Sequence, residues 1–281
     1  MTHTQSPAHS AHIEISSVPQ TMLLTLFARA KYSQMPRPVF YDAKSIEILH
    51  DLNYDFSLAD KDMAMSSGTV ARTIVLDRML RERLVQHPDC TVVNLGCGLD
   101  TRFYRLDNGQ MQWYDIDLPE SIEVRRRFFT DTDRVHTITT SAMDAAWTEQ
   151  IPSTGKQVYV IIEGLSMYLT ANDIRQIFAI ISARFSRVEV IMEIMPNIWK
   201  RKGDRVEKSV AATAARFTWS ADTGAEVVPL APGFRWTADR DILDGMTILH
   251  PQLRLLRLLP APLRRRFTNH FAEKFTIFAK P

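Results

Sequence analysis

Glycines and carboxylates stand directly after short apolar runs of this 281-residue chain, where they could bind a nucleoside. The run TVVNL is followed by Gly96 and Gly98, and the run QWYDI leads to Asp115 and Asp117. Glycine lets the backbone turn sharply and approach a ligand closely, and an acid about twenty residues further on can accept hydrogen bonds from ribose hydroxyls. The spacing predicts a pocket for an adenosyl ligand.

Two further runs extend this pattern. After VHTIT, the carboxylate of Asp144 can accept a hydrogen bond from an adenine amino group, and Met143 can cover the ring. Glu163 lies in the apolar stretch VYVIIEGLSMYL, where an unpaired carboxylate is costly, so it contacts either an Arg or Lys side chain or a ligand, and we favour the ligand. Thr101 stands where a dinucleotide fingerprint has its third glycine, which argues against nicotinamide and flavin dinucleotides.

Alternating strand and helix signals indicate how these residues are positioned. The predicted strands are short apolar runs at 91–95, 112–116, 135–139, 157–162 and 188–194, with a further candidate at 271–279. Helices are predicted between strands, one beginning at Pro119 and one behind the cap residue Thr170. Such alternation is typical of an α/β fold with a doubly wound, mostly parallel sheet, which binds ligands beyond the carboxyl ends of its strands.

The remaining segments suggest one domain with additions. Residues 1–20 are polar and lack an apolar core, so we expect a disordered tail and no signal peptide. Residues 21–281 are expected to form a single domain that begins with helices, predicted at 21–31, 44–52 and 70–86. The interval 195–241 breaks the alternation and is predicted to be a substrate lid or insertion, although its sequence also permits a part of the core.

Composition excludes several classes of protein. A formal net charge of +2 is too mild to indicate a nucleic-acid surface. The only cysteines, Cys90 and Cys97, exclude a disulfide framework, and no histidine has a recognisable ligand spacing, so we expect no metal site. No apolar run is long enough to cross a bilayer. We therefore expect a cytoplasmic protein with no nucleic-acid or membrane partner, whose oligomeric state the sequence leaves open.

Three segments resemble the leucine carboxyl methyltransferase family: VVNLGCGLDTRFYRL, WYDIDLP followed by EVRRRF, and IIEGLSMYL. The resemblance runs from about Ala28 to Ile194. It implies a Rossmann-like class I methyltransferase fold, S-adenosyl-L-methionine as methyl donor and S-adenosyl-L-homocysteine as product. It further implies methyl transfer to an oxygen, often of a carboxylate, in a group that includes protein phosphatase methyltransferases and bacterial polyketide-tailoring enzymes.

The resemblance also assigns residues to the cofactor. It implies that Lys31 and Arg72 hold the methionine carboxylate, for which a pair of cations is suited. The other implied contacts are Gly96 in the glycine loop, Asp117 toward the ribose, Met143 and Asp144 near the adenine, and Glu163 after the fourth strand.

The methyl acceptor is predicted to be a small molecule oriented by Arg102, Tyr104 and Tyr168, with Arg102 clamping an acid. A carboxylate is already an anion at pH 7, whereas a phenol or alcohol needs a general base, and none is clearly visible. The sequence therefore favours formation of a methyl ester in secondary metabolism. A methyltransferase acting on a protein C-terminal carboxylate and a non-catalytic, cofactor-binding scaffold are the alternatives.

Overall fold

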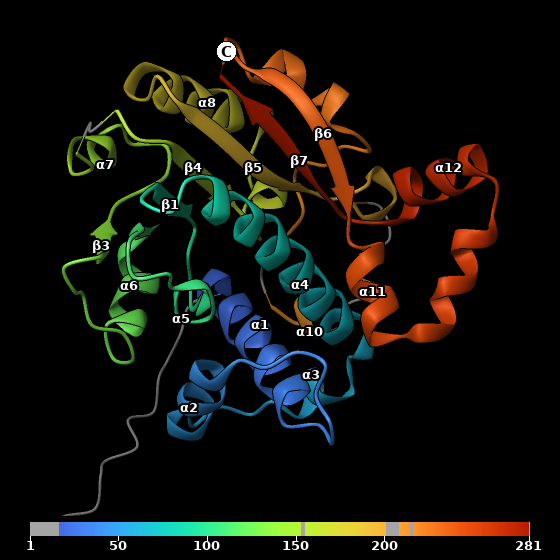
Figure 1. Cartoon of the computed structure of the whole chain (residues 1–281). Coiled ribbons are helices and arrows are strands. Elements are labelled where there is room, and N and C mark those ends of the chain that lie inside the picture. The colour runs from blue at the N-terminus through green and yellow to red at the C-terminus, as the bar shows by residue number, and fades with distance from the viewer. Residues whose placement is uncertain (1–16, 153–154, 201–207, 214–215, 281) are drawn as a thin grey trace, which may run out of the picture.

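The computed structural model describes residues 17–152, 155–200, 208–213 and 216–280 (Figure 1). The predicted disordered tail falls mostly outside these ranges, but its last residues belong to the first helix, which begins at Ser17. In the described part of the chain, no helix is long and apolar enough to span a membrane.

The described strands form a seven-stranded sheet with the order β3-β2-β1-β4-β5-β7-β6. The strands are β1 (Thr91–Leu95), β2 (Gln112–Asp117), β3 (Val135–Thr139), β4 (Val158–Ile162), β5 (Val188–Ile194), β6 (Arg235–Asp241) and β7 (Lys274–Ala279). Strands β1 to β5 are parallel, and β7 lies antiparallel between β5 and β6. The predicted α/β fold with a mostly parallel, doubly wound sheet is confirmed.

Helices cover both faces of this sheet (Figure 1). They are α1 (Ser17–Ser33), α2 (Ala43–Asp51), α3 (Ser57–Lys61), α4 (Met63–Gln86), α5 (Arg102–Leu106), α6 (Pro119–Arg125), α7 (Ala146–Glu149), α8 (Ala171–Arg184), α10 (Lys208–Ala211), α11 (Leu243–Leu249) and α12 (Ala261–Phe271), with 3-10 turns η1 (Ser166–Tyr168), η2 (Gly224–Glu226), η3 (Val228–Leu230) and η4 (Pro251–Leu258). Side chains of α4 and α5 pack on one sheet face, and those of α8 pack on the other. Because both faces are buried, the central strands are mostly apolar, as expected of parallel sheets, and two of their polar residues, Asn94 and Glu193, lie toward the carboxyl ends of the strands.

The starts of two helices follow from local capping. Helix α8 has the predicted cap, since Thr170 accepts a hydrogen bond from Asp173 N (3.2 Å) and the Asp173 carboxylate accepts one from Thr170 N (2.8 Å). Helix α4 begins earlier than the predicted 70–86, because Asp62 accepts a hydrogen bond from Met65 N (3.1 Å) and caps it. Residues 66–69, which directly precede the predicted helix, therefore lie inside α4.

The predicted lid, residues 195–241, ends in a strand that sequence analysis did not anticipate. Its last part is β6, which pairs antiparallel with β7 at the edge of the sheet. Upstream, Ala221 N donates a hydrogen bond to Met195 O (2.9 Å), and Thr218 N donates one to Met167 O (2.8 Å). These bonds hold the segment against the carboxyl ends of β4 and β5, and residues 201–207 and 214–215 lie outside the described residues. A lid role for the rest of the segment stays a prediction.

Candidate functional site

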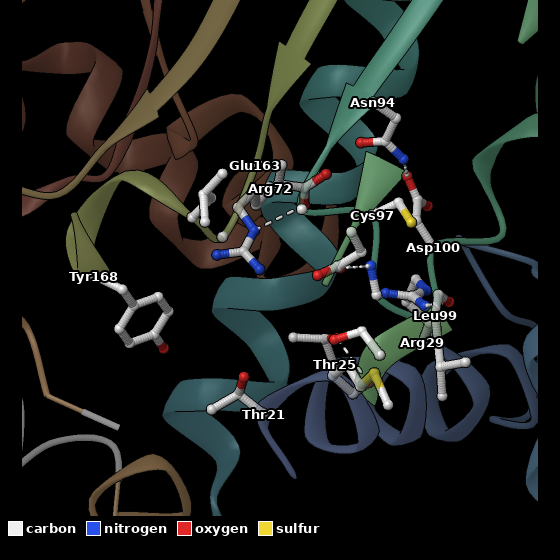
Figure 2. A pocket seen from close by; sticks show the side chains of 17 residues that line it. Thr21, Thr25, Arg29, Arg72, Asn94, Cys97, Leu99, Asp100, Glu163 and Tyr168 are labelled. Atoms are coloured by element: carbon white, nitrogen blue, oxygen red, sulfur yellow. Dashed lines mark hydrogen bonds and ion pairs between the residues drawn. The ribbon is translucent and has the colours of Figure 1, made fainter. Parts of the chain in front are cut away.

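A cavity lies beyond the carboxyl ends of β1, β2 and β4, with α1 along one side (Figure 2). Its lining includes Gly96, Cys97, Gly98, Asp100, Asp117, Glu163 and Gly164 after the strands, Thr21, Thr25 and Arg29 from α1, Arg72 from α4, and Tyr168 from η1. Parallel pairing brings these strand ends together, because Asn94 of β1 lies beside Asp115 of β2 and Ile161 of β4. The cavity is therefore where a doubly wound sheet binds its ligands.

The glycine loop after β1 has the predicted geometry. Gly96 has φ +71° and Gly98 has φ +46°, a region that side-chain-bearing residues rarely adopt. A Cβ added to Gly98 would lie 3.0 Å from Met22 Cβ, and one added to Gly96 would lie 3.2 Å from a Leu165 methyl carbon. The two glycines thus keep the loop narrow and leave its backbone exposed to the cavity.

Asp117 lies at the rim of the same loop. Its carboxylate accepts hydrogen bonds from Gly98 N (2.7 Å) and Leu118 N (2.7 Å). Burial raises the pKa of Asp117 above its usual value, although these backbone donors oppose the rise. The oxygens are thereby fixed at the cavity wall, where lone pairs can still accept hydrogen bonds from a ligand.

Asp115 is placed differently from the sequence prediction. It is 0% exposed, and its oxygens accept from Arg125 Nη2 (2.6 Å), Trp113 Nε1 (2.9 Å) and Asn94 Nδ2 (3.1 Å). Asp115 does not line the cavity, so its assignment to the cofactor is corrected. It holds β1, β2 and α6 together beneath the site.

Three residues implied by the family resemblance are also not among the described cavity-lining residues. Lys31 pairs with Asp60 at the surface (2.9 Å). Met143 packs against the apolar core on one sheet face, and Asp144 is exposed and accepts a hydrogen bond from Ala146 N (2.9 Å). All three assignments to the cofactor therefore lack a contact with this cavity.

Arg72 and Glu163 meet at the centre of the cavity wall (Figure 2). Arg72 donates from Nε to Glu163 Oε1 (2.9 Å) and from Nη1 to Glu193 Oε1 (2.8 Å). Sequence analysis weighed a protein cation against a ligand as the partner of Glu163. Glu163 contacts an arginine, which confirms the protein cation as a partner. Because Glu163 also lines the cavity, contact with a ligand stays a prediction.

Arg102 is not placed to orient an acceptor. Its side chain is 1% exposed and donates to Asp77 Oδ1 (2.8 Å), to Glu163 Oε2 (2.6 Å) and to Asp100. Tyr104 is 47% exposed and packs on Phe129 outside the cavity. Both predicted roles are corrected, because neither side chain lines the cavity.

The ion pairs around these arginines form one buried network with more acids than bases. Among the described residues, the network contains four guanidinium groups, those of Arg29, Arg72, Arg102 and Arg105. They pair with six carboxylates, those of Asp42, Asp77, Asp100, Glu163, Glu193 and Glu273. Burial raises the pKa of Glu193, and the like charge of Glu163 adds to the rise, which Arg72 opposes. The cavity wall is therefore electronegative and suited to a cationic ligand.

One member of this network predicts how stability depends on pH. Burial alone would raise the pKa of Asp42, but Arg105 and Arg29 outweigh it and hold this pKa below its usual value. Such a carboxyl stabilises the fold above its unfolded-state pKa of about 3.9, and the contribution is lost as the pH falls through the lower folded-state pKa. We expect Asp42→Asn to be less stable than the native chain at neutral pH but to lose less further stability in acid.

Urea unfolding at pH 7 and at about pH 3.5, just below the unfolded-state pKa, checks this expectation. Equal losses of unfolding free energy in the native chain and in Asp42→Asn would show that Asp42 does not titrate differently in the two states. An exposed substitution, Asp133→Asn, is the matched control.

A second cavity opens beside the first and shares part of its wall. Both cavities are lined by Thr21, Thr25, Arg72, Gly164 and Tyr168. Tyr168 lies at the boundary between the two cavities, and its predicted role in orienting the acceptor stays a prediction. The same side chains would therefore contact a molecule in either cavity.

Sequence analysis missed the contribution of α1. Thr21, Thr25 and Arg29 line the first cavity, and Arg29 donates from Nη2 to Leu99 O (2.8 Å) in the glycine loop. Their four-residue spacing places them on one face of α1, and that polar stripe in an otherwise apolar helix is the signal that could have identified them.

The fold is shared with known structures. A DUF574 family protein from Streptomyces avermitilis matches with a TM-score of 0.59 at 12% identity, over 92% of this chain and 97% of that protein. A SAM-dependent methyltransferase from Anabaena variabilis matches with a TM-score of 0.50 at 11% identity, over 76% of this chain and 86% of that protein.

Two relatives are similar in sequence over most of their length. The tetracenomycin polyketide synthesis O-methyltransferase TcmP of Streptomyces glaucescens is 31% identical over 238 residues, covering 83% of this chain and 86% of TcmP. The S-adenosyl-L-methionine-dependent methyltransferase dpfgK of Gibberella zeae is 28% identical over 273 residues, covering 86% of each chain.

The strand order, the glycine loop and these likenesses define a Rossmann-like methyltransferase that uses S-adenosyl-L-methionine. The family model described as leucine carboxyl methyltransferase matches residues 22–182. The chain belongs to this family, which confirms the resemblance noted in its sequence and the predicted cofactor.

Proposed function

We propose that this methyltransferase transfers the methyl group to an oxygen of a small molecule. The observation that carries the proposal is the wall shared by two cavities, with Arg72 and Tyr168 at their boundary. The first cavity would take the methyl donor and the second the acceptor. The name of TcmP, an O-methyltransferase of polyketide synthesis, supports an oxygen acceptor and a role in secondary metabolism.

The residues of the first cavity fit the donor. Asp117 would accept hydrogen bonds from the ribose, and the narrow loop of Gly96 and Gly98 would let the backbone approach the ligand. The acidic excess around Glu163 and Glu193 complements a molecule that carries a sulfonium and an ammonium group. When bound, the donor supplies an electrophilic methyl group.

The protein contributes mainly position and exclusion of water. Displacement at a methyl carbon requires the acceptor oxygen in line with the bond that breaks, and orientation alone can supply a large part of the acceleration. Helix α1 flanks both cavities through Thr21 and Thr25, so it separates the boundary from bulk solvent on that side.

The predicted carboxylate acceptor keeps one source of structural support. Arg72 lines both cavities and is the cation that could meet a carboxylate, and the family is described as one of carboxyl methyltransferases. Arg102, the predicted clamp, is buried away from both cavities, so methyl ester formation no longer has the residue on which it was based. A hydroxyl acceptor is the second candidate.

Calorimetric titration with S-adenosyl-L-methionine, S-adenosyl-L-homocysteine and NAD tests the donor site. We expect both adenosyl-sulfur ligands to bind and NAD not to bind. Methyl label should then appear in a soluble product; label in a protein would instead favour a protein carboxyl methyltransferase. Binding without any turnover would favour the scaffold alternative.

The Asp117→Ala variant should weaken binding of S-adenosyl-L-homocysteine by about 1–3 kcal/mol, because buried hydrogen-bond partners of the ribose are lost. Asp133→Ala, at an exposed position before β3, is the control and should bind normally. Unchanged affinity of Asp117→Ala would remove the ribose assignment.

A further inference from the structure

A basic and apolar segment, residues 250–272, connects α11 to β7. It contains five arginines, at positions 254, 257, 264, 265 and 266, and no aspartate or glutamate. The segment comprises η4 and α12, which lie at the outer edge of the molecule beyond α11 (Figure 1). The whole chain has a formal net charge of only +2, so the η4–α12 segment concentrates positive charge in one place.

Large apolar side chains of the η4–α12 segment are exposed to solvent. Five of the fifteen described large apolar side chains that are exposed lie in it, namely Leu255, Leu258, Leu263, Phe267 and Phe271. The two leucines of η4 are three residues apart, which places them on one side of a 3-10 helix. Four-residue spacing places the other three on one face of α12, where the two phenyl rings lie 5.1 Å apart between centroids. Exposed apolar side chains gathered in this way mark an interaction site.

Exposed arginines stand beside these apolar side chains. Arg254 directly precedes an exposed leucine and Arg266 directly precedes an exposed phenylalanine, and neither forms an ion pair with a described carboxylate. Asp222 lines a groove together with Arg266, but its carboxylate accepts a hydrogen bond from Asn197 N (2.8 Å). Arg264 lines a different cleft, with two carboxylates of β6, and is not part of this surface. The surface therefore combines positive charge with apolar contact area.

This combination narrows the choice of partner. A second copy of the chain, paired about a twofold axis, would bring arginines against arginines, which is unfavourable. A nucleic acid would pair with the arginines through its phosphates but would leave the leucines without apolar contacts. An acidic protein would also attract the arginines, but leucine is under-represented among the anchors of protein interfaces. An anionic lipid bilayer provides both contacts, because its headgroups attract arginine and its acyl chains take up leucine and phenylalanine.

The second cavity gives such binding a purpose. Its lining includes Leu24, Met167 and Phe217, which suits an apolar molecule. Apolar molecules concentrate in the acyl region of a bilayer, because their transfer out of water is favourable. A methyltransferase held at a bilayer would therefore meet an apolar acceptor at a higher local concentration.

We propose that the η4–α12 segment binds the surface of an anionic lipid bilayer. Its leucines and phenylalanines enter the boundary between headgroups and acyl chains, and Arg254 and Arg266 pair with lipid phosphates. This inference goes beyond the proposed function, since it concerns a surface and not the two cavities. Sequence analysis expected no membrane partner because no apolar run can cross a bilayer, but binding at the surface requires no such run.

Co-sedimentation of the full chain with unilamellar vesicles tests the proposal. Vesicles of phosphatidylcholine alone are compared with vesicles that contain about one third phosphatidylglycerol. We expect binding to the anionic vesicles to be at least about tenfold stronger, and to weaken in high salt, because salt screens the lipid charges. Equal binding to both kinds of vesicle, or binding to neither, would overturn the proposal.

Two double variants separate the contributions of charge and of apolar contact. Arg254→Gln with Arg266→Gln should weaken binding to the anionic vesicles by about tenfold or more, since each arginine near such a surface adds to the attraction. Leu255→Ser with Leu258→Ser should weaken it by about the same factor, since leucine surface no longer leaves water. All four side chains are exposed, so we expect both variants to fold.

The matched control is Arg78→Gln with Arg81→Gln, which removes two exposed arginines of α4 and should leave vesicle binding unchanged. Equal losses in this control and in the arginine variant of the η4–α12 segment would overturn the assignment to this surface. Light scattering of the lipid-free chain tests the competing partner, because a dimer that the leucine variant dissociates would assign the surface to a second copy instead. Vesicle binding requires no methyl donor, so its failure would leave the proposed function intact, and failure of the donor to bind would leave the vesicle result intact.

Discussion

Replacing Arg102 by methionine is expected to lower the free energy of unfolding by about 3–5 kcal/mol, the cost of breaking a buried ion-pair network at one partner. The guanidinium is 1% exposed and holds Asp77, Asp100 and Glu163. Burial alone would raise the pKa of Asp100, but Arg102 with its neighbouring arginines holds it below its usual value. Methionine fills a similar volume without the charge. The lower free energy of unfolding would therefore arise from the buried carboxylates that no longer have a cation beside them.

The measurement is urea unfolding at pH 7, with Arg134→Met as control. Arg134 pairs with Asp107 on the surface, where solvent screens the pair, so its removal should leave the unfolding midpoint nearly unchanged. Equal midpoints for the two variants would mean that the network around Arg102 is far less coupled than its hydrogen bonds indicate.

Gly245→Ala is expected to destabilise the fold by about 1–3 kcal/mol or more, through overpacking where two helices cross. Helix α11 packs on α4, and a Cβ on Gly245 would overlap the carbonyl oxygen and the Cα of Ala71. Because these are backbone atoms, relief requires the helices to separate.

Gly68→Ala is expected to change stability in the opposite direction. Gly68 lies inside α4, and its added Cβ would make only one ordinary contact, so alanine should stabilise the helix by about 0.5–1 kcal/mol. Thermal unfolding of both variants checks the pair. A Gly245→Ala variant as stable as Gly68→Ala would show that the crossing of α11 and α4 is loose.

The sequence predicted the strands of the parallel sheet well because their apolar runs are bounded by clear turn and cap signals. β1, β3 and β5 begin and end at the predicted residues, and Thr170 caps α8 as expected. β6 was missed because it is an edge strand of polar and charged residues, RWTADRD, which is typical of exposed edges. Its pairing with β7 is a long-range contact that local patterns do not indicate.

The candidate site was predicted in part. Gly96, Gly98, Asp117 and Glu163 line the first cavity, because each follows a strand and strand ends converge. Asp115 lies two residues before Asp117 on the same face of β2, but deeper in the strand, where Arg125 holds it. Asp117 is the last residue of β2 and lines the cavity. Position along the strand thus separates the two acids, which their shared spacing from the glycines could not do.

The charged side chains were the hardest to place from sequence. A family motif identified Arg72, whose position at both cavities matches its implied importance, but it also identified Lys31, which pairs with Asp60. The pairing of arginines with acids depends on contacts far apart along the chain, such as Arg72 with Glu193. No local pattern specifies such partners.

The antiparallel strand β7 is synthesised after β1 to β5, so the site is completed late in synthesis of the chain. Strands β1 to β5 and helices α1 and α4 already supply the glycine loop, Asp117 and Arg72 before residue 273 has been made. Until β7 pairs with β5, however, β5 is an open edge that other chains can join. Docking of β7 closes this edge and brings Glu273 to the second cavity in the same step, so a ribosome-bound chain would hold the walls of the first cavity while the second is still incomplete.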